Sequence, residues 1–417
     1  MHPVNAGEPD AIEVTLLMPC LDEAQTIATC VRKGFESLQR EGIRGEVLVA
    51  DNGSTDGSPD IATRCGARVV AVHERGYGAA LRHGIQRARG RFVIMADADD
   101  SYDWRDIAPF VQRLREGYDF VMGCRLPQGG GRIMPGAMPH LNRYVGNPVL
   151  SGIGRALFRC PITDFHCGMR GFDREKVLAL DLKTPGMEFA TEMVIRATQA
   201  RLKIVEVPIT LHRDGRSRPP HLRPWRDGWR HLRFMLLYSP NWLFWLPGLV
   251  LLGLGLLGFA LILPGPLRIA HINLDANTLL FSALACIVGH QWISFALAAH
   301  ALGERDGLLA PDRSLRRLQA IFSLERGIGV GLLLMCAGLF LLGVSLRYWA
   351  SLQFGDIPYA TGLRIVIPSV TLLALGAQFI MSSFFFSLTL LKPYASAGRS
   401  AEGAVESPSA EARPPLV

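Results

Sequence analysis

The chain has 417 residues and a mass of 45.8 kDa; 49% of its residues are hydrophobic and only 19% are charged. With a mean hydropathy of +0.21, this composition excludes an ordinary soluble enzyme and predicts that part of the chain lies in lipid. The net charge of +7 comes almost wholly from arginine, which suits phosphates or anionic lipid headgroups; we expect no nucleic-acid partner.

The cysteines and the first residues indicate a protein that faces the cytoplasm. None of the eight cysteines forms a C-x-x-C pair, which predicts reduced, buried thiols. Residues 1–13, an N-terminal extension, hold three acidic residues and no apolar run, so no secretory signal peptide is expected.

Strand-like and helix-like segments alternate from residue 14 onward. Apolar strands are predicted at 14–19, 46–51, 67–73 and from 91, with helices within 24–40, 58–66 and 78–90. This alternation predicts an α/β domain with a mainly parallel sheet and helices on both faces. Ligands of such sheets bind beyond the carboxyl ends of the strands.

Acidic residues stand at three of these strand ends. Glu23 follows the first strand, Asp51 ends the second, and Asp97 and Asp99 follow the fourth. Two carboxylates two residues apart can share a hard divalent cation whose other ligands are water and phosphate oxygens. A lone D-x-D is usually a solvated turn, but acidic residues at neighbouring strand ends favour a binding site.

Four segments, in order, resemble motifs of the family-2 nucleotide-sugar glycosyltransferases of GT-A fold: MPCLDEAQTI, VADNGSTDGS, ERGYGAALRHGIQRARG and MADADD. Further along, VMGCRLPQGGGR, LNRYVGNPVLSGIGRALF and ITDFHCGMRGFDREKVL resemble the polyprenyl-phosphate sugar synthases, such as dolichol-phosphate mannose or glucose synthases. The resemblance covers about residues 14–215. It implies a Rossmann-like GT-A domain and an inverting transfer of one hexose from a nucleotide sugar, UDP-glucose or GDP-mannose, to a polyprenyl phosphate.

The resemblance also implies roles on the donor side. Pro19 and Glu23 would line the nucleotide pocket, and Asp51 would recognise the base. Asp97 and Asp99 would hold Mg²⁺ or Mn²⁺ against the diphosphate, which gains negative charge as the glycosidic bond breaks.

On the acceptor side, Arg125 and Arg143 match arginines expected to bind the lipid phosphate. Guanidinium groups suit this role because they bind two phosphate oxygens at once and keep their charge. Asp164 would lie beside the acceptor. A phosphate with a second pKa of about 6 is already largely ionised near pH 7, so Asp164 would position substrate rather than remove a proton. The implied catalytic residues are Asp97, Asp99, Arg125 and Asp164.

Four apolar runs fill most of residues 241–392, at about 242–264, 277–302, 327–346 and 365–391. Each contains about 20 residues or more without Lys, Arg, Asp or Glu, enough at 1.5 Å per residue to cross a hydrocarbon core of about 30 Å. The sequence therefore predicts an α-helical transmembrane domain of four spans, and an integral protein of a bacterial inner (plasma) membrane.

Arginine placement predicts the orientation of the spans. Arginines are concentrated before the first run and between the second and third runs, while the other two connections are poor in basic residues. Basic loops stay in the cytoplasm, so the catalytic domain and both termini should be cytoplasmic. The last residues, 393–417, contain few large apolar side chains and are expected to form a disordered tail.

Residues 216–240 predict an amphipathic helix at the membrane interface. Trp225, Trp229, Leu232 and Leu236 fall at i, i+4, i+7 and i+11. Three arginines, at positions 226, 230 and 233, occupy the neighbouring face. Such a pattern suits a helix that lies among lipid headgroups.

Two other functions remain open from the sequence. A processive polysaccharide synthase also pairs a family-2 domain with membrane helices. Such enzymes resemble one another in a Q-x-x-R-W motif, whereas the nearest stretch here, HLRPW (221–225), lacks the Gln and shifts the Arg. An inactive membrane scaffold or transporter component would have lost the acidic strand ends, whereas Asp51, Asp97 and Asp99 are present. The sugar, for which glucose is slightly favoured, the base, the isoprenoid length and the oligomeric state stay open.

Overall fold

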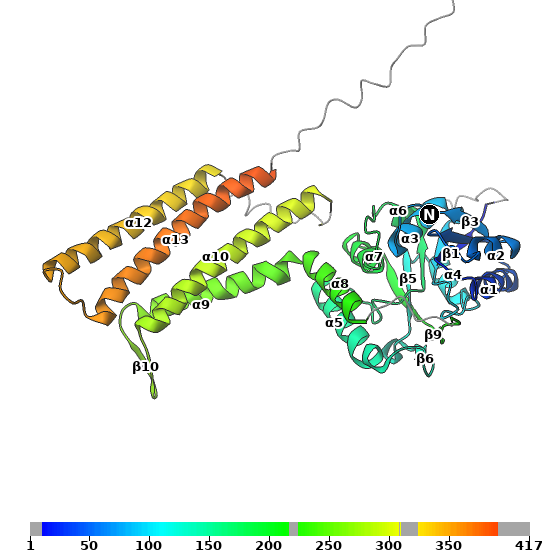
Figure 1. Ribbon diagram of the computed structural model, residues 1–417, viewed down its shortest axis with the longest axis horizontal. Helices are drawn as coiled ribbons and strands as arrows, with labels where there is room; N and C mark the ends of the chain where they lie inside the picture. The colour runs from blue at the N-terminus through cyan, green and yellow to red at the C-terminus, as the bar shows by residue number, and fades with distance from the viewer. Residues whose placement is uncertain (1–10, 217–223, 308, 310–323, 391–417) are drawn as a thin grey trace, which may run out of the picture. The chain divides into compact units, whose positions relative to one another are not determined.

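The computed structural model describes residues 11–216, 224–307, 309 and 324–390. The chain divides into two compact units, residues 1–243 and 244–417. The first unit combines strands and helices, and the second consists almost wholly of helices (Figure 1). Most of the predicted N-terminal extension, the predicted tail at 393–417 and much of the arginine-rich connection before the third apolar run lie outside the described residues.

A seven-stranded sheet, in the order β3-β2-β1-β4-β7-β5-β8, forms the centre of the first unit. All neighbouring strands are parallel except β7, which runs antiparallel to β4 and β5. The mainly parallel sheet predicted from the sequence is therefore confirmed. The strands are β1 (Val14–Cys20), β2 (Gly45–Asp51), β3 (Arg68–Ala71), β4 (Phe92–Met95), β5 (Phe120–Cys124), β7 (Arg170–Asp173) and β8 (Ile204–Pro208).

Helices cover both faces of the sheet because successive residues of a strand point in opposite directions. Leu16 and Met18 of β1 lie against Gly34 of one helix, and Leu17 lies against Gly84 of another. These are α1 (Ile27–Arg40) and α3 (Tyr77–Arg87). The other helices of the α/β core are α2 (Ser58–Arg64), α4 (Ala108–Arg115), α6 (Arg174–Leu178) and α7 (Phe189–Gln199).

The segment 125–169 leaves the sheet after β5 and returns to it as β7. Because β7 is antiparallel to its neighbours, this segment begins and ends at the carboxyl edge of the parallel strands. It contains a short 3-10 helix η1 (Pro127–Gly129), strand β6 (Arg132–Ile133), which pairs with β9 (Thr210–Leu211), a π-helix η2 (Asn142–Gly146) and α5 (Asn147–Phe158).

The predicted amphipathic helix is present as α8 (Pro224–Leu237), which packs against α5. Met235 is fully buried, whereas Trp229 is 59% exposed, and Arg233 is also exposed. The His231 ring lies 4.9 Å from the His166 ring. The helix thus has one side packed on the first unit and an outer side that carries a large aromatic ring and arginine.

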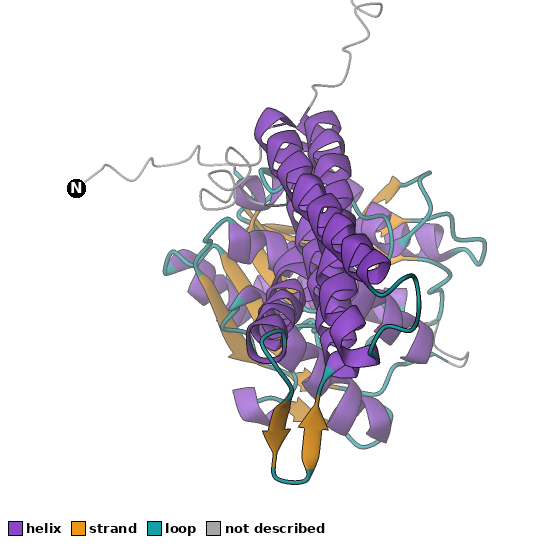
Figure 2. Cartoon of the chain, turned by 90° about the vertical axis from the view of Figure 1, so that its left-hand side faces the viewer, coloured by secondary structure: helices purple, strands orange, loops and turns teal. Residues whose placement is uncertain are grey.

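The second unit contains the four helices predicted from the apolar runs. They are α9 (Leu246–Ile262), which continues the π-helix η3 (Asn241–Trp245), α10 (Ala276–Arg305), α12 (Leu324–Ser351) and α13 (Tyr359–Leu390). Together with η3, α9 is long and apolar enough to cross a membrane, and so are the other three helices. A two-stranded hairpin, β10 (Leu267–Ile269) and β11 (Ile272–Leu274), joins α9 to α10 (Figure 2).

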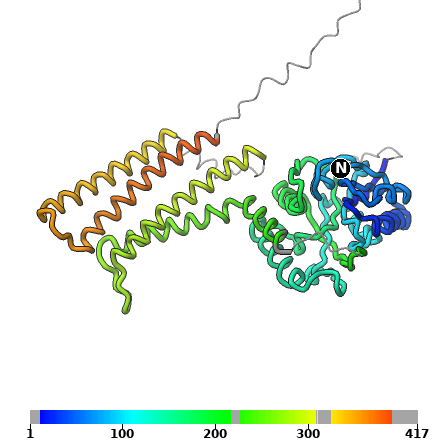
Figure 3. The backbone as a smooth tube through the Cα atoms, in the orientation of Figure 1, coloured from blue at the N-terminus to red at the C-terminus, as the bar shows by residue number. Residues whose placement is uncertain are grey.

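Small residues bring these helices together in pairs, α9 with α10 and α12 with α13 (Figure 3). A Cβ atom on Gly255 would lie 2.7 Å from the backbone nitrogen of Cys286, and one on Gly331 would lie 2.7 Å from the carbonyl oxygen of Gly376. Close backbone approach at small residues is typical of helices that associate in lipid.

The fourth helix begins earlier than the apolar run predicted. It starts at Tyr359 rather than near residue 365, and so includes Arg364. The Arg364 guanidinium forms an ion pair with Asp275, just before α10, at 2.5 Å. This partner allows an arginine within the helix, so hydropathy alone placed the boundary too late.

Candidate donor and acceptor site

The acidic residues predicted to bind the donor lie at the carboxyl edge of the sheet. Glu23 comes three residues after β1, Asp51 ends β2, and Asp97 and Asp99 follow β4 directly. β1 lies between β2 and β4, so three adjacent strands deliver these side chains. The sheet order explains why residues far apart in the sequence share one edge.

An arginine joins two of these carboxylates. Nη2 of Arg216 lies 2.8 Å from Oε1 of Glu23 and 3.1 Å from Oδ2 of Asp99. Nε of Arg216 also donates to Oε2 of Glu23, at 2.9 Å. Asp99 accepts two further hydrogen bonds through Oδ1, from the backbone N–H of Ser101 at 3.0 Å and from its hydroxyl at 2.6 Å.

Asp97 has a different environment. The Tyr77 hydroxyl donates to Oδ1 of Asp97 at 3.0 Å. Burial, together with the nearby charge of Asp99, raises the pKa of Asp97 to about 6. Burial and the Asp97 charge hold the pKa of Tyr77 well above its usual range, so the phenol stays protonated and remains a donor. A cation beside both carboxylates would offset the repulsion between Asp97 and Asp99 that raises this pKa.

The carboxylate oxygens at this edge of the sheet fit a divalent ion such as Mg²⁺ or Mn²⁺. Asp97 and Asp99 provide carboxylate oxygens, and a guanidinium already contacts Asp99 where a cation would bind. Within the described ranges, no cluster of three His, Cys, Asp or Glu side chains could enclose a metal ion. Mg²⁺ is usually held by one or two carboxylates together with substrate phosphates and water.

Asp51 and Pro19 lie at the same edge but make structural contacts. The Asp51 carboxylate accepts hydrogen bonds from the backbone N–H groups of Gly53 and Ser54, at 3.1 and 3.2 Å, and so holds the turn after β2. Pro19 is buried in β1, paired in register with Ala50. Their predicted roles toward the nucleotide stay predictions.

On the acceptor side, Arg125 and Asp164 form a buried ion pair. Nε of Arg125 donates to Oδ2 of Asp164 at 2.8 Å, and Nη2 donates to Oδ1 at 2.9 Å. Burial alone would raise the pKa of the Asp164 carboxyl, but the charge and hydrogen bonds of Arg125 hold that pKa below its usual range. Asp164 is therefore a paired carboxylate that orients Arg125, and a poor base.

Tyr102 and Glu206 hold this pair in place. The Tyr102 hydroxyl accepts a hydrogen bond from Nη1 of Arg125 at 3.4 Å and one from the Gly168 backbone N–H at 2.9 Å. Glu206 accepts from the backbone N–H of Asp164 at 2.9 Å. Because Tyr102 follows the D-x-D loop, it connects the donor-side aspartates with the acceptor-side arginine.

Arg143 lies on η2, on an exposed apolar surface. Its guanidinium stacks over the Tyr144 ring at 5.3 Å. Tyr144 is 65% exposed, and Val145 and Val149 are about half exposed. We name this surface the η2–α5 face; its exposed apolar residues are Leu141, Tyr144, Val145 and Val149.

The inner side of α5 packs on the loop that carries Asp164. The Ser151 hydroxyl accepts a hydrogen bond from the Phe165 backbone N–H at 3.2 Å, and Gly154 lies against the Phe165 ring. On the same loop, His166 contacts His231 of α8. Two helices with exposed apolar residues therefore converge on residues 164–166.

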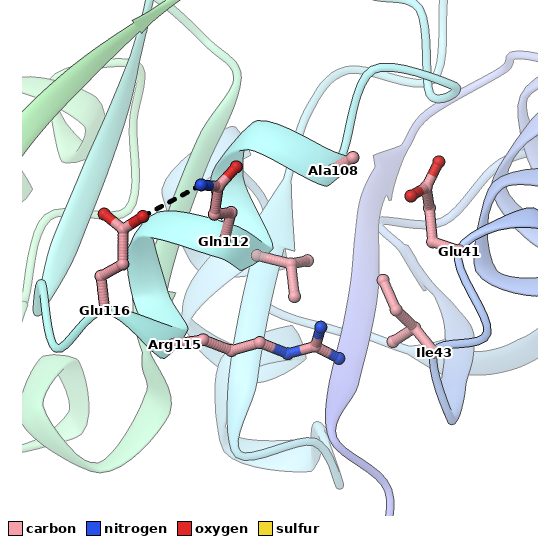
Figure 4. Close-up of a pocket in the computed structure, with 7 residues that line it drawn as sticks. Glu41, Ile43, Ala108, Gln112, Arg115 and Glu116 are labelled. Atoms are coloured by element: carbon pink, nitrogen blue, oxygen red, sulfur yellow. Dashed lines mark hydrogen bonds between the residues drawn. The ribbon is translucent and has the colours of Figure 1, made fainter.

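A shallow hollow elsewhere in the first unit is not part of this site. It lies between α4 and the residues that precede β2, and Glu41, Ile43 and Arg115 are among its lining residues (Figure 4). Ile43 precedes the amino end of β2, which is the edge of the sheet opposite to Asp51.

The sequence interpretation missed four residues of the site: Arg216, Tyr77, Tyr102 and Glu206. The sequence places Arg216 in the juxtamembrane segment, among many arginines, yet its side chain contacts Glu23 and Asp99. Tyr102 could have been suspected from its place just after MADADD. Glu206 has no sequence signal, because its role depends on the pairing of β5 with β8.

Comparison with protein families identifies the class. Residues 15–180 match the model for glycosyl transferase family 2, and residues 297–390 match the model for the glycosyltransferase family 2 C-terminal transmembrane region. The chain belongs to glycosyltransferase family 2, with a GT-A catalytic domain and an integral membrane domain. The predicted family and fold are therefore confirmed.

Several proteins of Haloferax volcanii are similar to this chain. The low-salt glycan biosynthesis hexosyltransferase Agl6 is 34% identical over 383 residues, which cover 91% of this chain and 90% of that protein. A dolichyl-phosphate hexose transferase is 32% identical over 166 residues, 40% of this chain and 69% of that protein.

Solved structures also include similar chains. Glucosyl-3-phosphoglycerate synthase from Mycobacterium tuberculosis, crystallised with Mn²⁺ and UDP, is 22% identical, with a TM-score of 0.42. The match covers 54% of this chain and 78% of that one.

Proposed function

We propose that this glycosyltransferase moves one hexose from a nucleotide sugar, UDP-glucose or GDP-mannose, to a polyprenyl phosphate, with inversion at the anomeric carbon. One observation carries the proposal: the loop with Asp164 joins the buried Arg125 pair to two helices that have exposed apolar residues. A phosphate-binding cation next to an apolar, arginine-bearing surface suits a lipid phosphate. The similarity to a dolichyl-phosphate hexose transferase supports the same acceptor class.

On the donor side, Asp97 and Asp99 would hold Mg²⁺ or Mn²⁺, and the ion would stabilise the charge that develops on the leaving diphosphate. Tyr77 fixes the orientation of the Asp97 carboxylate through its hydrogen bond. Glu23 and Pro19 would line the nucleotide pocket, and Asp51 would recognise the base through the turn that it holds.

On the acceptor side, Arg125 and Arg143 would bind the lipid phosphate. Asp164 keeps the Arg125 guanidinium charged and fixes its plane. The pairing with Arg125 keeps Asp164 ionised, and an ionised phosphate can attack without losing a proton. Asp164 therefore acts as a positioning residue, and no general base is needed.

The acceptor lipid would be presented at the cytoplasmic face of a bacterial inner (plasma) membrane. The η2–α5 face and the outer side of α8 carry aromatic and aliphatic side chains beside arginines, a combination that suits anionic headgroups. With the catalytic domain in the cytoplasm, the nucleotide sugar is available from the cell interior.

The test is a transfer assay on membranes that contain the full chain. Labelled UDP-glucose and GDP-mannose are supplied with polyprenyl phosphate, and the lipid phase is extracted. The expected product is an acid-labile lipid monophosphate bearing one sugar. A water-soluble chain of several sugars would instead establish a processive synthase, and absence of transfer with every donor would favour an inactive scaffold.

A further inference from the structure

Arg216 occupies an unusual position for the first residue of the predicted juxtamembrane segment. Its guanidinium lies between Glu23 and Asp99, 2.8 Å from the first carboxylate and 3.1 Å from the second. Its positive charge also lowers the pKa of Asp97. The side chains of the three contacting residues are only 6–13% exposed. The Arg216 guanidinium therefore offsets repulsion among acidic side chains that lie close to one another.

The backbone, and not the guanidinium, sets this position. The N–H of His212 donates to the carbonyl oxygen of Ser101, and the N–H of Gly215 donates to that of Asp99, both at 2.9 Å. A Cβ atom on Gly215 would lie 3.0 Å from a methyl group of Thr26, so a glycine allows the segment to approach α1 closely. Residues 212–215 thus follow the D-x-D loop and deliver Arg216 to Asp99 even if its side chain is changed.

We propose that Arg216 is a tethered cation that occupies the cation position at Asp99 while the donor site holds no divalent ion. This inference rests on the proposed binding of a divalent ion by Asp97 and Asp99. The Oδ2 atom of Asp99 contacts the guanidinium, and its Oδ1 atom accepts from Ser101. The guanidinium must therefore leave Oδ2 before a divalent ion can bind there.

This exchange couples the divalent ion to the nucleotide. When the ion binds alone, Arg216 loses the Asp99 half of its ion pair without gaining a new anion. When a nucleoside diphosphate binds with the ion, its oxygens give the displaced guanidinium a partner. Linkage then requires that each ligand strengthens the binding of the other, with Arg216 as the physical basis of the coupling.

The experiment measures Mn²⁺ binding by the full chain in detergent, from the loss of the electron paramagnetic resonance signal of free Mn²⁺. Affinity is determined without nucleotide and with saturating UDP or GDP. For R216Q we expect nucleotide-free binding to be roughly tenfold tighter than in the wild type, because the ion no longer has to displace a mostly buried cation. The extra gain on adding nucleotide should shrink by a similar factor.

Two controls separate occupancy of the site from a general loss of charge. R216K keeps the charge but loses the two-pronged contact, and should fall between the wild type and R216Q. K33Q removes a charge that pairs with Asp100 at 2.6 Å, next to Asp99, and should bind Mn²⁺ like the wild type. An equal effect of K33Q and R216Q would overturn the tethered-cation inference.

The two proposals can also fail separately. If D99N lowers Mn²⁺ affinity while R216Q leaves it unchanged, the divalent-ion site stands and the role of Arg216 is wrong. If D99N binds Mn²⁺ as tightly as the wild type, the proposed metal ligands are wrong, and with them the exchange. Thermal unfolding of each variant identifies any protein that has lost its fold. If R216Q is unfolded, the Mn²⁺ affinity of R216K relative to the wild type tests the role of Arg216 instead.

Discussion

The Arg125 guanidinium binds both carboxylate oxygens of Asp164, through Nε and Nη2, and the Arg125 backbone N–H donates to Oδ2 as well, at 3.0 Å. The Asp164 side chain is fully buried and that of Arg125 is 9% exposed. Removing one partner of such a pair leaves a buried charge, at a cost of about 3–5 kcal/mol. The Arg125–Asp164 pair therefore fixes the position of the proposed acceptor-binding guanidinium.

Replacing Arg125 should affect the acceptor and spare the donor. We expect R125A to lower transfer to polyprenyl phosphate by roughly 100-fold or more, and R125K to recover only part, because an ammonium lacks the two-pronged geometry. Nucleotide-sugar binding, measured by calorimetry, should change little. R155A, at an exposed position of α5, is the matched control. Unimpaired lipid transfer by a folded R125A would contradict the assignment.

The ion pair also predicts how stability depends on pH. The pKa of Asp164 is lower in the folded protein than in the unfolded chain, so the pair stabilises the fold above the ordinary aspartate pKa of about 3.9. This contribution is lost as the pH falls through the folded pKa. D164N does not titrate, so the unfolding temperatures of wild type and D164N should differ most above about pH 5. Calorimetry should show this difference shrinking below pH 4; a constant difference would argue against the pair.

Tyr102 should act through the residues that it holds. Y102F removes the acceptor for the Gly168 N–H and for Arg125, which we expect to cost about 1–3 kcal/mol of stability. Lipid transfer should fall roughly tenfold while donor binding stays unchanged. Y118F, which alters a half-buried tyrosine just before β5, serves as the control. Equal kinetics for the two variants would remove Tyr102 from the site.

Much of this architecture could be predicted from the sequence. The alternation of apolar strands with amphipathic helices predicted strands β1 to β4 and the polar residues at their carboxyl ends, because each of these signals is local in the sequence. Four long apolar runs predicted the membrane helices for the same reason. The position of β7 between β4 and β5 could not be predicted, since it depends on pairing between strands distant in sequence.

The same distinction holds for the site. The spacing of Asp97 and Asp99 after an apolar strand predicts that they belong to a binding site. Nothing in the sequence distinguishes Arg216 from the many neighbouring arginines, and its location follows from the backbone hydrogen bond of Gly215. Asp164 and Arg125 were assigned separately, and their direct pairing follows from the three-dimensional structure alone.

Divalent ions should be required for transfer. Chelation with EDTA should abolish activity, and Mg²⁺ or Mn²⁺ should restore it. D99A should be inactive yet folded. In the wild type, the Asp99 carboxylate contacts mainly Ser101 and Arg216 and lies at the edge of the sheet. D60N, on the exposed side of α2, is the control. Full activity of D99A would reject the metal assignment.

The orientation of the membrane helices can be tested by thiol labelling in intact cells. A cysteine at Ser351, at the end of α12, should react with an impermeant reagent. Cysteines at Ser314 and Ser400, positions outside the described residues, should resist it unless the cells are opened. The unmodified chain, with its own cysteines, gives the background. Reaction at Ser314 in intact cells would reverse the predicted topology.

The antiparallel course of β7 has an evolutionary consequence. Residues 125–169 leave and rejoin the seven-stranded sheet at one edge, so this segment can change in length and content while the strands of that sheet keep their register. The donor half, built on β1, β2 and β4, lies outside this segment. Under the proposed function, a change confined to residues 125–169 alters acceptor preference and leaves the residues proposed to bind the nucleotide sugar in place. This segment is therefore the one to exchange when acceptor preference is to be redesigned.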